Sequence, residues 1–429
     1  MESRPVQVSF GEAFRFWLKL GFISFGGPTG QIAIMHQELV ERRRWISESR
    51  FLHALNYCML LPGPEATQLA TYIGWLMHRT WGGIVAGSLF VLPSVFILIA
   101  LSCVYMTYGN VPLIAGIFYG IKPAVTAIVV AAAHRIGSRA LRHPALWAIA
   151  AAAFVAIFAF DAPFPAIVLA AGLAGTLGGR FFPAIFAHEG SHEAVKGYGP
   201  AIIDDGTPTP PHALFSWAKL WGHVAAGVIL WALVLGALAA AGGWQGTLAQ
   251  MGWFFTKAAL LTFGGAYAVL PYVFQGAVEH YHWLTAPQMI DGLALGETTP
   301  GPLIMVVAFV GYVGAGVAGA LVATFFTFLP SFVFIFIGAP FIETTHGNLK
   351  FSAPLTGITA AVVGVILNLA LFFAWHVLWP QGAAGPFDLF SALIGAAALV
   401  ALFRYKAGVM PVIGACALAG LAYTLLRSP

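Results

Sequence analysis

Charged residues are scarce in this chain. Asp, Glu, Lys and Arg make up only 8% of its 429 residues, whereas 59% are hydrophobic and the mean hydropathy is +0.85. A soluble domain carries about a quarter charged residues. The scarcity therefore excludes a water-soluble globular protein and indicates a chain that crosses a membrane several times. The net charge of +4, confined to short loops, gives no sign of nucleic-acid binding.

Cysteine is scarce as well. Cys58, Cys103 and Cys416 lie far apart in apolar stretches and without CxxC spacing, so neither a disulfide framework nor a structural zinc site is expected. The amino terminus lacks the pattern of a cleavable signal, because Arg15 and Lys19 interrupt its apolar run. We therefore expect no metal, no other cofactor, and membrane insertion by the mature helices.

Glycine and proline are abundant, and they mark a pattern that occurs twice. One apolar stretch breaks at Phe-Gly-Gly and the next at Pro-Gly-Pro. The second-half breaks, at 263–265 and 300–302, both lie 238 positions after their counterparts at 25–27 and 62–64. Further along, Leu-Pro-Ser recurs at an offset of 237, at 92–94 and 329–331. The chain therefore contains an internal duplication.

The apolar runs predict an all-α polytopic membrane protein. Each half holds two broken helical units and then four spanning runs, at 81–108, 111–134, 145–160 and 163–178 and at 317–343, 351–378, 388–403 and 408–426. One extra helix, at 214–242, belongs to neither half. The predicted units are a first repeat (1–179), a polar cytoplasmic connector (180–212), a linking transmembrane helix (213–245) and a second repeat (246–429).

The basic residues favour broken units that enter and leave the membrane on one side. Such re-entrant units place Arg42 to Arg44, Arg79 and the connector together in the cytoplasm, as the positive-inside rule requires. The extra helix then inverts the second half. We predict two inverted repeats, and an alternative with about 13 crossings stays open. Inverted repeats with discontinuous helices are typical of transporters whose site lies near the membrane midplane.

A helix broken inside a bilayer leaves free N–H groups and the positive end of a helix dipole at the start of its second part. An anion is the natural partner for these groups, and glycine lets it approach the backbone closely. The breaks and the polar residues beside them form the predicted substrate site: Phe25, Gly26, Gly27, Thr29, Gln31, Pro62, Gly63, Pro64, Thr67, Gln68, Gly264, Gly265, Thr298, Thr299, Pro300, Gly301 and Pro302.

Three lysines strengthen the anion interpretation. Lys19 and Lys257 occupy equivalent positions, roughly 10 Å along the helix before their Phe-Gly-Gly breaks. Lys122 lies inside an apolar run directly before Pro123. A lysine inside a membrane segment is a candidate functional residue, and we add all three to the substrate site. The alternative is that they extend to the membrane interface and solvate there.

Two carboxylates flank the Pro-Gly-Pro breaks, Glu65 in the first half and Glu297 in the second. A buried carboxylate can carry a proton, so both are candidates for proton coupling. For Glu65 the alternative is that it only caps its helix. Four other polar residues are interpreted as interface or loop residues: His36, His53, Asp291 and His280.

One motif suggests a different class of protein. Residues 188–192 read His-Glu-Gly-Ser-His, which matches the HExxH pattern of zinc proteases. The match lies in the polar connector, contains a glycine, and would need Asp204 or Asp205 as a third ligand from a loop. A membrane metalloprotease is therefore a remote alternative.

The paired motifs resemble the chromate ion transporter family in its long two-domain form. The resemblance lies in Phe25 to Pro28, Trp45-Ile46 and Leu61 to Pro64 of the first half, and in 263–267 and 299–302 of the second. It extends over nearly the whole chain. Two departures are the polar connector and Glu297-Thr298, where the first half has Met59-Leu60.

The resemblance implies a transporter, not an enzyme, in the inner membrane of a bacterium. It implies efflux of chromate, a tetrahedral dianion, driven by the proton motive force and giving chromate resistance. Without the resemblance, the residues predict only an anion transporter, with protons and the bilayer as partners. Sulfate is the second candidate anion, because it has the same shape and charge. An exchanger, an anion channel and a homodimeric assembly stay open.

Overall fold

The computed structural model describes residues 8–25, 27–109, 111–186, 198–345 and 352–427. Within these ranges the chain forms no β-strand, only an isolated bridge between Ile46 and Ile203. The first half contains α1 (Phe10–Ile23), α2 (Gly27–His36), the π-helix η1 (Gln37–Arg42), α3 (Glu48–Cys58), α4 (Glu65–Tyr108), α5 (Pro112–Ala140), α6 (Pro144–Phe160), α7 (Phe164–Phe181) and α8 (Pro183–Phe186).

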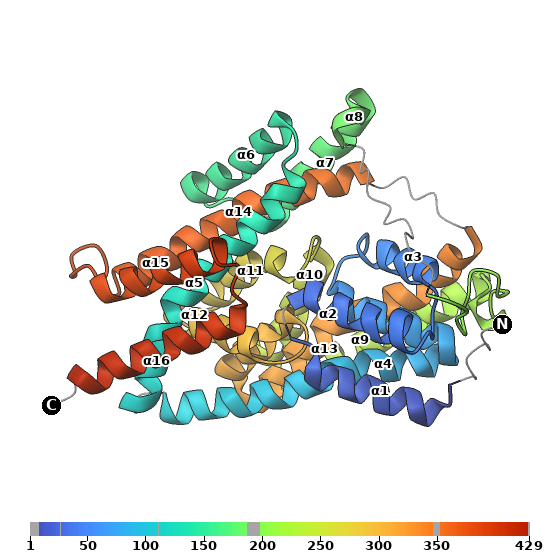
Figure 1. The fold of residues 1–429 in the computed structure, drawn as a ribbon, viewed down its shortest axis with the longest axis horizontal. Helices are drawn as coiled ribbons and strands as arrows, with labels where there is room; N and C mark the ends of the chain where they lie inside the picture. The colour runs from blue at the N-terminus through green and yellow to red at the C-terminus, as the bar shows by residue number, and fades with distance from the viewer. Residues whose placement is uncertain (1–7, 26, 110, 187–197, 346–351, 428–429) are drawn as a thin grey trace.

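The connector contains one short 3-10 turn, η2 (Pro211–Ala213), and leads into α9 (Trp217–Gly242). The second half, coloured yellow to red in Figure 1, has nearly the same order of elements as the first. It contains α10 (Thr247–Leu261), α11 (Ala266–Phe274), the π-helix η3 (Gln275–His280), α12 (Ala286–Thr298), η4 (Leu303–Met305), α13 (Val306–Thr345), α14 (Ser352–Leu378), α15 (Leu389–Phe403) and α16 (Val409–Arg427). The two π-helices occupy equivalent positions.

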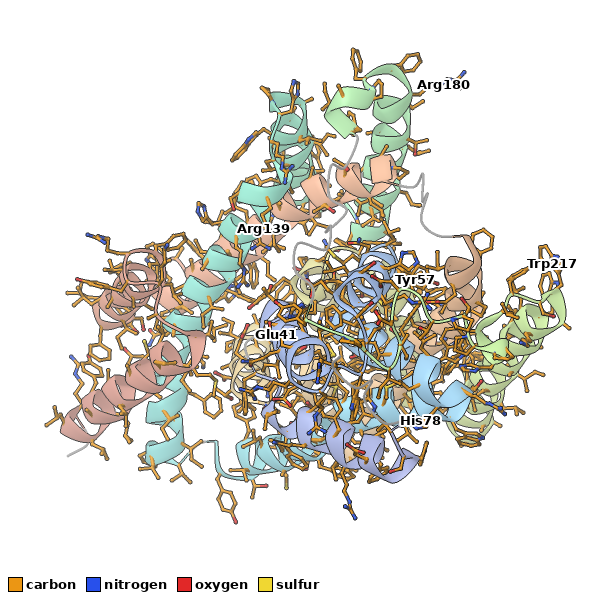
Figure 2. All side chains as sticks on the ribbon, turned by 45° about the vertical axis from the view of Figure 1, so that its right-hand side comes forward. Glu41, Tyr57, His78, Arg139, Arg180 and Trp217 are labelled. Atoms are coloured by element: carbon orange, nitrogen blue, oxygen red, sulfur yellow. The ribbon has the colours of Figure 1, made fainter. Side chains whose placement is uncertain are left out.

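Among the described helices, seven are long and apolar enough to cross a membrane: α4, α5, α7, α9, the α13 segment, α14 and α16. The shorter apolar helices α6 and α15 accompany them. The predicted all-α polytopic membrane protein is thereby confirmed. The extra helix α9 buries only Leu235, and its Trp217 lies at the outer edge of the molecule (Figure 2). This helix therefore turns nearly all of its apolar surface outward.

The long helices α4 and α13 each reverse direction at a kink. In α4 the kink lies at His78 and Arg79, and a Cβ on Gly82 would collide with the carbonyl oxygen of Gly74. Eight residues of straight helix span about 12 Å, so this contact requires the chain to fold back. The second half repeats the arrangement 237 positions later, at Ala315, Gly316, Gly311 and Gly319.

The two ends of each first-half broken unit lie together. Arg43, at the end of the first unit, approaches Glu12 and the Phe16 ring near its beginning, at 3.7 and 4.9 Å. In the second unit, Arg50 near the start of α3 and Tyr72 late in the first segment of α4 both contact Glu343. Both broken units of the first half are therefore hairpins.

The connector packs against this same end. The backbone N–H of Ser47 donates to the carbonyl of Ile203 at 2.9 Å, and a ring nitrogen of His212 lies 3.0 Å from the Trp75 carbonyl. Ser47 also caps α3, because its hydroxyl accepts the Arg50 N–H. The connector thus contacts both the start and the end of the second hairpin.

The two halves interleave along α5 and α14. In Figure 1, α5 lies along α15 and α16, whereas α14 lies along α6 and α7. Gly120 allows α5 to approach Gly420 closely, and the equivalent Gly357 allows α14 to approach Gly175. Small residues permit this kind of backbone contact between membrane helices. Each half therefore supplies the packing surface of the other.

Candidate functional site

The helix breaks of the two halves meet and bind one another. The backbone N–H of Gly63 donates to the carbonyl of Thr262, and that of Gly301 donates to the carbonyl of Ser24, both at 2.7 Å. Ser24 and Thr262 are the C-cap residues of α1 and α10. A helix C-terminus leaves carbonyls without intrahelical partners. The Pro-Gly-Pro loop of each half satisfies one of them in the other half.

The glycines of these loops have no substitute. Gly63 and Gly301 have φ values of +122° and +107°, which L side chains rarely adopt. A Cβ on Gly63 would strike the Ser331 hydroxyl, and one on Gly301 would strike that of Ser94. Ser94 donates its hydroxyl to the Pro300 carbonyl. Both the backbone conformation and the space therefore require glycine.

Two buried glutamines form hydrogen bonds to the carbonyls of the Pro-Gly-Pro loops. The Gln31 amide nitrogen donates to the Gly301 carbonyl, and that of Gln68 donates to the Pro62 carbonyl at 2.8 Å. Four buried polar atoms nearby have no hydrogen-bond partner among the described residues: Gln31 Oε1, Gln68 Oε1, Thr67 Oγ1 and Ser331 Oγ. Buried polar atoms are normally paired. Their concentration at the breaks marks this region as the candidate site.

The two Phe-Gly-Gly breaks differ in their surroundings. The described α2 side chains bury only Gln31 and Met35, and Phe25 and Thr29 are exposed. In contrast, every residue of α11 is buried, although Gly264 before it is exposed. Gly26 lies outside the described residues. The helix after the first break is therefore largely open, whereas α11, after the second break, packs against α14.

The two coupling candidates occupy different positions at the Pro-Gly-Pro loops. Glu65 is the first residue of α4 and is half-buried. Glu297 is half-buried and accepts a hydrogen bond from the Tyr267 hydroxyl. Arg135 of α5 lies within electrostatic reach of both Glu297 and Tyr267. Arg135 is not among the site residues predicted from the sequence, although a cation near the end of an apolar run was a usable signal.

The two threonines at the end of α12 bond to their own helix. The hydroxyls of Thr298 and Thr299 donate to the carbonyls of Ala294 and Leu295. At the other end of α12, Thr285 and Gln288 form a capping box.

Two prolines precede the second part of their broken units. Pro64 is the residue before α4, and Pro302 is the residue before η4.

The three lysines lie in three different surroundings. Lys19 is exposed on α1. Lys257 lines a separate cavity of about 670 Å³ with Asp161 and Glu279, and its Nζ lies 5.8 Å from the centre of the Trp253 ring. Lys122 forms an ion pair with Asp291. The sequence thus identified membrane lysines without showing which partners they have.

Two ion pairs connect the halves, each with a buried carboxylate, and neither is predicted from the sequence. Lys122 Nζ lies 3.3 Å from Asp291, which we had interpreted as an interface or loop residue. Arg50 donates to Glu343 at 2.7 Å, and the Tyr72 hydroxyl donates to the same carboxylate at 2.5 Å. Partners so far apart in sequence cannot be paired without the tertiary structure.

The described residues offer no group of three or more His, Cys, Asp or Glu side chains that could hold a metal ion. The HExxH match at 188–192 lies outside the described residues. Its proposed third ligands are engaged elsewhere: Asp204 accepts from backbone N–H groups of its own turn, and Asp205 accepts from Ser47.

Comparison with known proteins decides the family. The chromate transporter family model matches residues 11–176 and again 249–421. The chain belongs to the chromate transporter family. Within it, a chromate transport protein of Pseudomonas aeruginosa is 36% identical, with 98% of this chain and 94% of that protein aligned. One from Cupriavidus metallidurans is 30% identical over 96% and 93% of the two chains.

A probable chromate transport protein of Synechococcus elongatus is 28% identical over 92% of this chain and 90% of that protein. No solved structure matches. The family match falls once on each half of this chain, and each match contains one Phe-Gly-Gly and one Pro-Gly-Pro break. The breaks that meet in the structure therefore lie inside the two segments that match the family.

Proposed function

We propose that this protein is a secondary active transporter that exports chromate from the bacterial cytoplasm across the inner membrane, driven by the proton motive force, and so confers chromate resistance. The observation that carries the proposal is the reciprocal binding of the breaks, Gly63 to Thr262 and Gly301 to Ser24. A ligand between them contacts both halves at once. When one half moves relative to the other, the ligand loses access to one side of the membrane and gains access to the opposite side.

The substrate is a tetrahedral oxyanion in this proposal. The first turns of α2 and α11 begin at the breaks, so their N–H groups lack intrahelical acceptors and attract negative charge. The hydroxyls of Thr67 and Ser331 are buried and available as donors. These groups would replace the hydration shell of chromate, and protonation of Glu65 or Glu297 would couple the cycle to the proton gradient.

The unequal packing of α2 and α11 supports alternating access. In one state of such a cycle, one of two equivalent helices is open and the other is buried. In the opposite state, α2 would be buried and α11 would be open. We therefore propose two inverted repeats, residues 1–179 and 246–429, with the linking helix within 213–245 and the connector on the cytoplasmic side. The grouping of the hairpin ends with the connector fits this orientation.

Everted membrane vesicles with an imposed proton motive force test the proposal. We expect chromate to accumulate inside them and an uncoupler to abolish the accumulation. Sulfate as a competitor ranks the two anions, because they share shape and charge. Sulfate flux without chromate flux would keep the architecture and replace the substrate, whereas chromate flux with no accompanying proton movement would indicate an anion channel.

A further inference from the structure

Asp291 lies deep in the structure with partners from the other half of the chain. It belongs to α12 and is 3% exposed. Its Oδ2 accepts a hydrogen bond from the Tyr105 hydroxyl of α4 at 2.8 Å and lies 3.3 Å from Lys122 Nζ of α5. Its Oδ1 has no hydrogen-bond partner in the described chain. The carboxylate therefore depends on one lysine for charge neutralisation.

The two members of this pair differ in access. The Lys122 side chain is 29% exposed, whereas that of Asp291 is 4% exposed. The ammonium group therefore has free surface at which an anion can bind, while the carboxylate stays enclosed. Of the elements packed against α12, α5 and α4 supply the charged and titratable partners of Asp291, namely Lys122 and Tyr105. Glu297 lies six positions further along α12, and Arg135 of α5 faces it.

A buried carboxylate stays ionised only while a cation compensates it. An oxyanion that binds Lys122 adds negative charge beside Asp291 and withdraws the lysine from it. Both changes favour the protonated carboxyl. A proton from water then forms an O–H bond on Asp291, and it leaves again when the anion departs and the lysine returns.

We propose that Lys122 and Asp291 form a shared site at which an oxyanion and a proton bind together, with the anion on Lys122 and the proton on Asp291. This inference rests on the proposed function, because it requires an oxyanion as substrate. It also determines the direction in which protons move. One proton and one dianion leave the cell together and carry one net negative charge, so the membrane potential drives export and the pH gradient opposes it.

Proton uptake by the purified full-length protein tests the shared site. In weakly buffered detergent solution with a pH indicator, we expect wild type to take up protons when chromate is added. Asp291→Asn should take up none, because asparagine keeps the shape but cannot titrate. Asp291→Asn should bind chromate at least as tightly as wild type, because asparagine resembles the protonated carboxyl. In wild type, the affinity for chromate should vary with pH by roughly 5- to 150-fold, the usual range for two coupled ligands, and in Asp291→Asn this variation should be lost.

Asp388→Asn is the matched control. Asp388 also accepts hydrogen bonds from a tyrosine hydroxyl, that of Tyr119, but it caps α15 and has no lysine partner among the described residues. Because chromate itself titrates near neutral pH, the signal is the difference between Asp291→Asn and this control. Equal proton uptake in the two variants would overturn the shared site.

The double variant Lys122→Gln, Asp291→Asn protects the test against misfolding, because it leaves no unpaired buried charge. We expect it to bind chromate more weakly than wild type and without proton uptake; unchanged affinity would overturn the role of Lys122. Wild type that binds no chromate would overturn the proposed function as well. Chromate binding with proton uptake undiminished in Asp291→Asn overturns this inference alone.

A second readout uses everted vesicles and ionophores. Nigericin collapses the pH gradient and spares the membrane potential, whereas valinomycin with potassium collapses the potential. Co-binding predicts that nigericin maintains or raises chromate accumulation and that valinomycin abolishes it. Loss of accumulation with nigericin alone would mean that protons move against the anion, and the shared site would be excluded.

Discussion

The backbone N–H of Gly63 lies 2.7 Å from the carbonyl oxygen of Thr262, 199 positions later in the chain. The equivalent bond from Gly301 to Ser24 has the same length. Neither bond can form within one half alone. The duplication is therefore a structural requirement of the site, since each copy completes the backbone hydrogen bonding of the other.

Alanine at Gly63 or Gly301 should abolish chromate accumulation. Each substitution puts a Cβ at a positive φ and against a serine hydroxyl, at a cost of about 1–3 kcal/mol in backbone strain. Everted vesicles and thermal unfolding of the purified protein measure both effects. Gly236→Ala in α9, where a Cβ meets nothing, is the control. Normal transport by Gly301→Ala would show that this loop does not need its glycine.

Glu297→Gln should uncouple transport from the proton gradient. Glutamine can still accept the Tyr267 hydrogen bond but carries no proton at neutral pH. Gradient-driven accumulation should fall roughly 5- to 150-fold while chromate exchange without a gradient persists. The same measurement on Glu65→Gln decides which of the two carboxylates couples, and Asp388→Asn serves as control. Coupling that survives in both variants would leave neither Glu65 nor Glu297 in this role.

Lys19→Ala combined with Lys257→Ala should abolish chromate transport while the protein stays in the membrane. Both lysines lie before a break, where positive charge raises the local anion concentration and the rate of entry by about tenfold or more. Transport rates at low and high salt, with membrane abundance measured alongside, test this expectation. Arg139→Ala, an exposed cation on α5, is the control (Figure 2). Full activity of the double variant contradicts the site assignment.

Arg50→Ala should destabilise the purified protein by about 3–5 kcal/mol, because it leaves Glu343 buried without a cation. Adding Glu343→Gln should recover part of the loss. Thermal or denaturant unfolding of the two single variants and the double variant measures the coupling. Arg42→Ala breaks an exposed pair with Glu38 and should cost no more than about 0.5 kcal/mol. Additive losses at Arg50 and Glu343 would argue against the pair.

Acidic pH should loosen the connector. Burial, with Arg79 and Lys219 nearby, lowers the pKa of His212 below its ordinary value. The neutral ring is therefore favoured when the connector is docked, so docking is strongest above about pH 6.5 and weakens below it. Proteolysis of the 198–213 segment should be faster at about pH 5.5 than at pH 7.5. His212→Gln should remove this difference, and a difference that persists would assign it to another group.

The sequence determined the class of protein and the positions of its breaks. Sparse charge and long apolar runs left membrane helices as the only way to satisfy the backbone, and the 238-residue offset identified equivalent positions. Capping at Ser47 and Thr285 was also readable, because caps depend on residues three positions apart. These features are local or periodic, so a pattern in the chain is enough to reveal them.

Only the tertiary structure decided which groups meet. Gly63 pairs with Thr262, Lys122 with Asp291, and Arg50 with Glu343, and each pair joins residues from different halves. It also placed Lys19 on an exposed face and Lys257 beside a cavity, and it left α2 open while α11 is buried. Such contacts depend on how helices pack across long sequence separations, and neither spacing nor composition encodes that packing in a readable form.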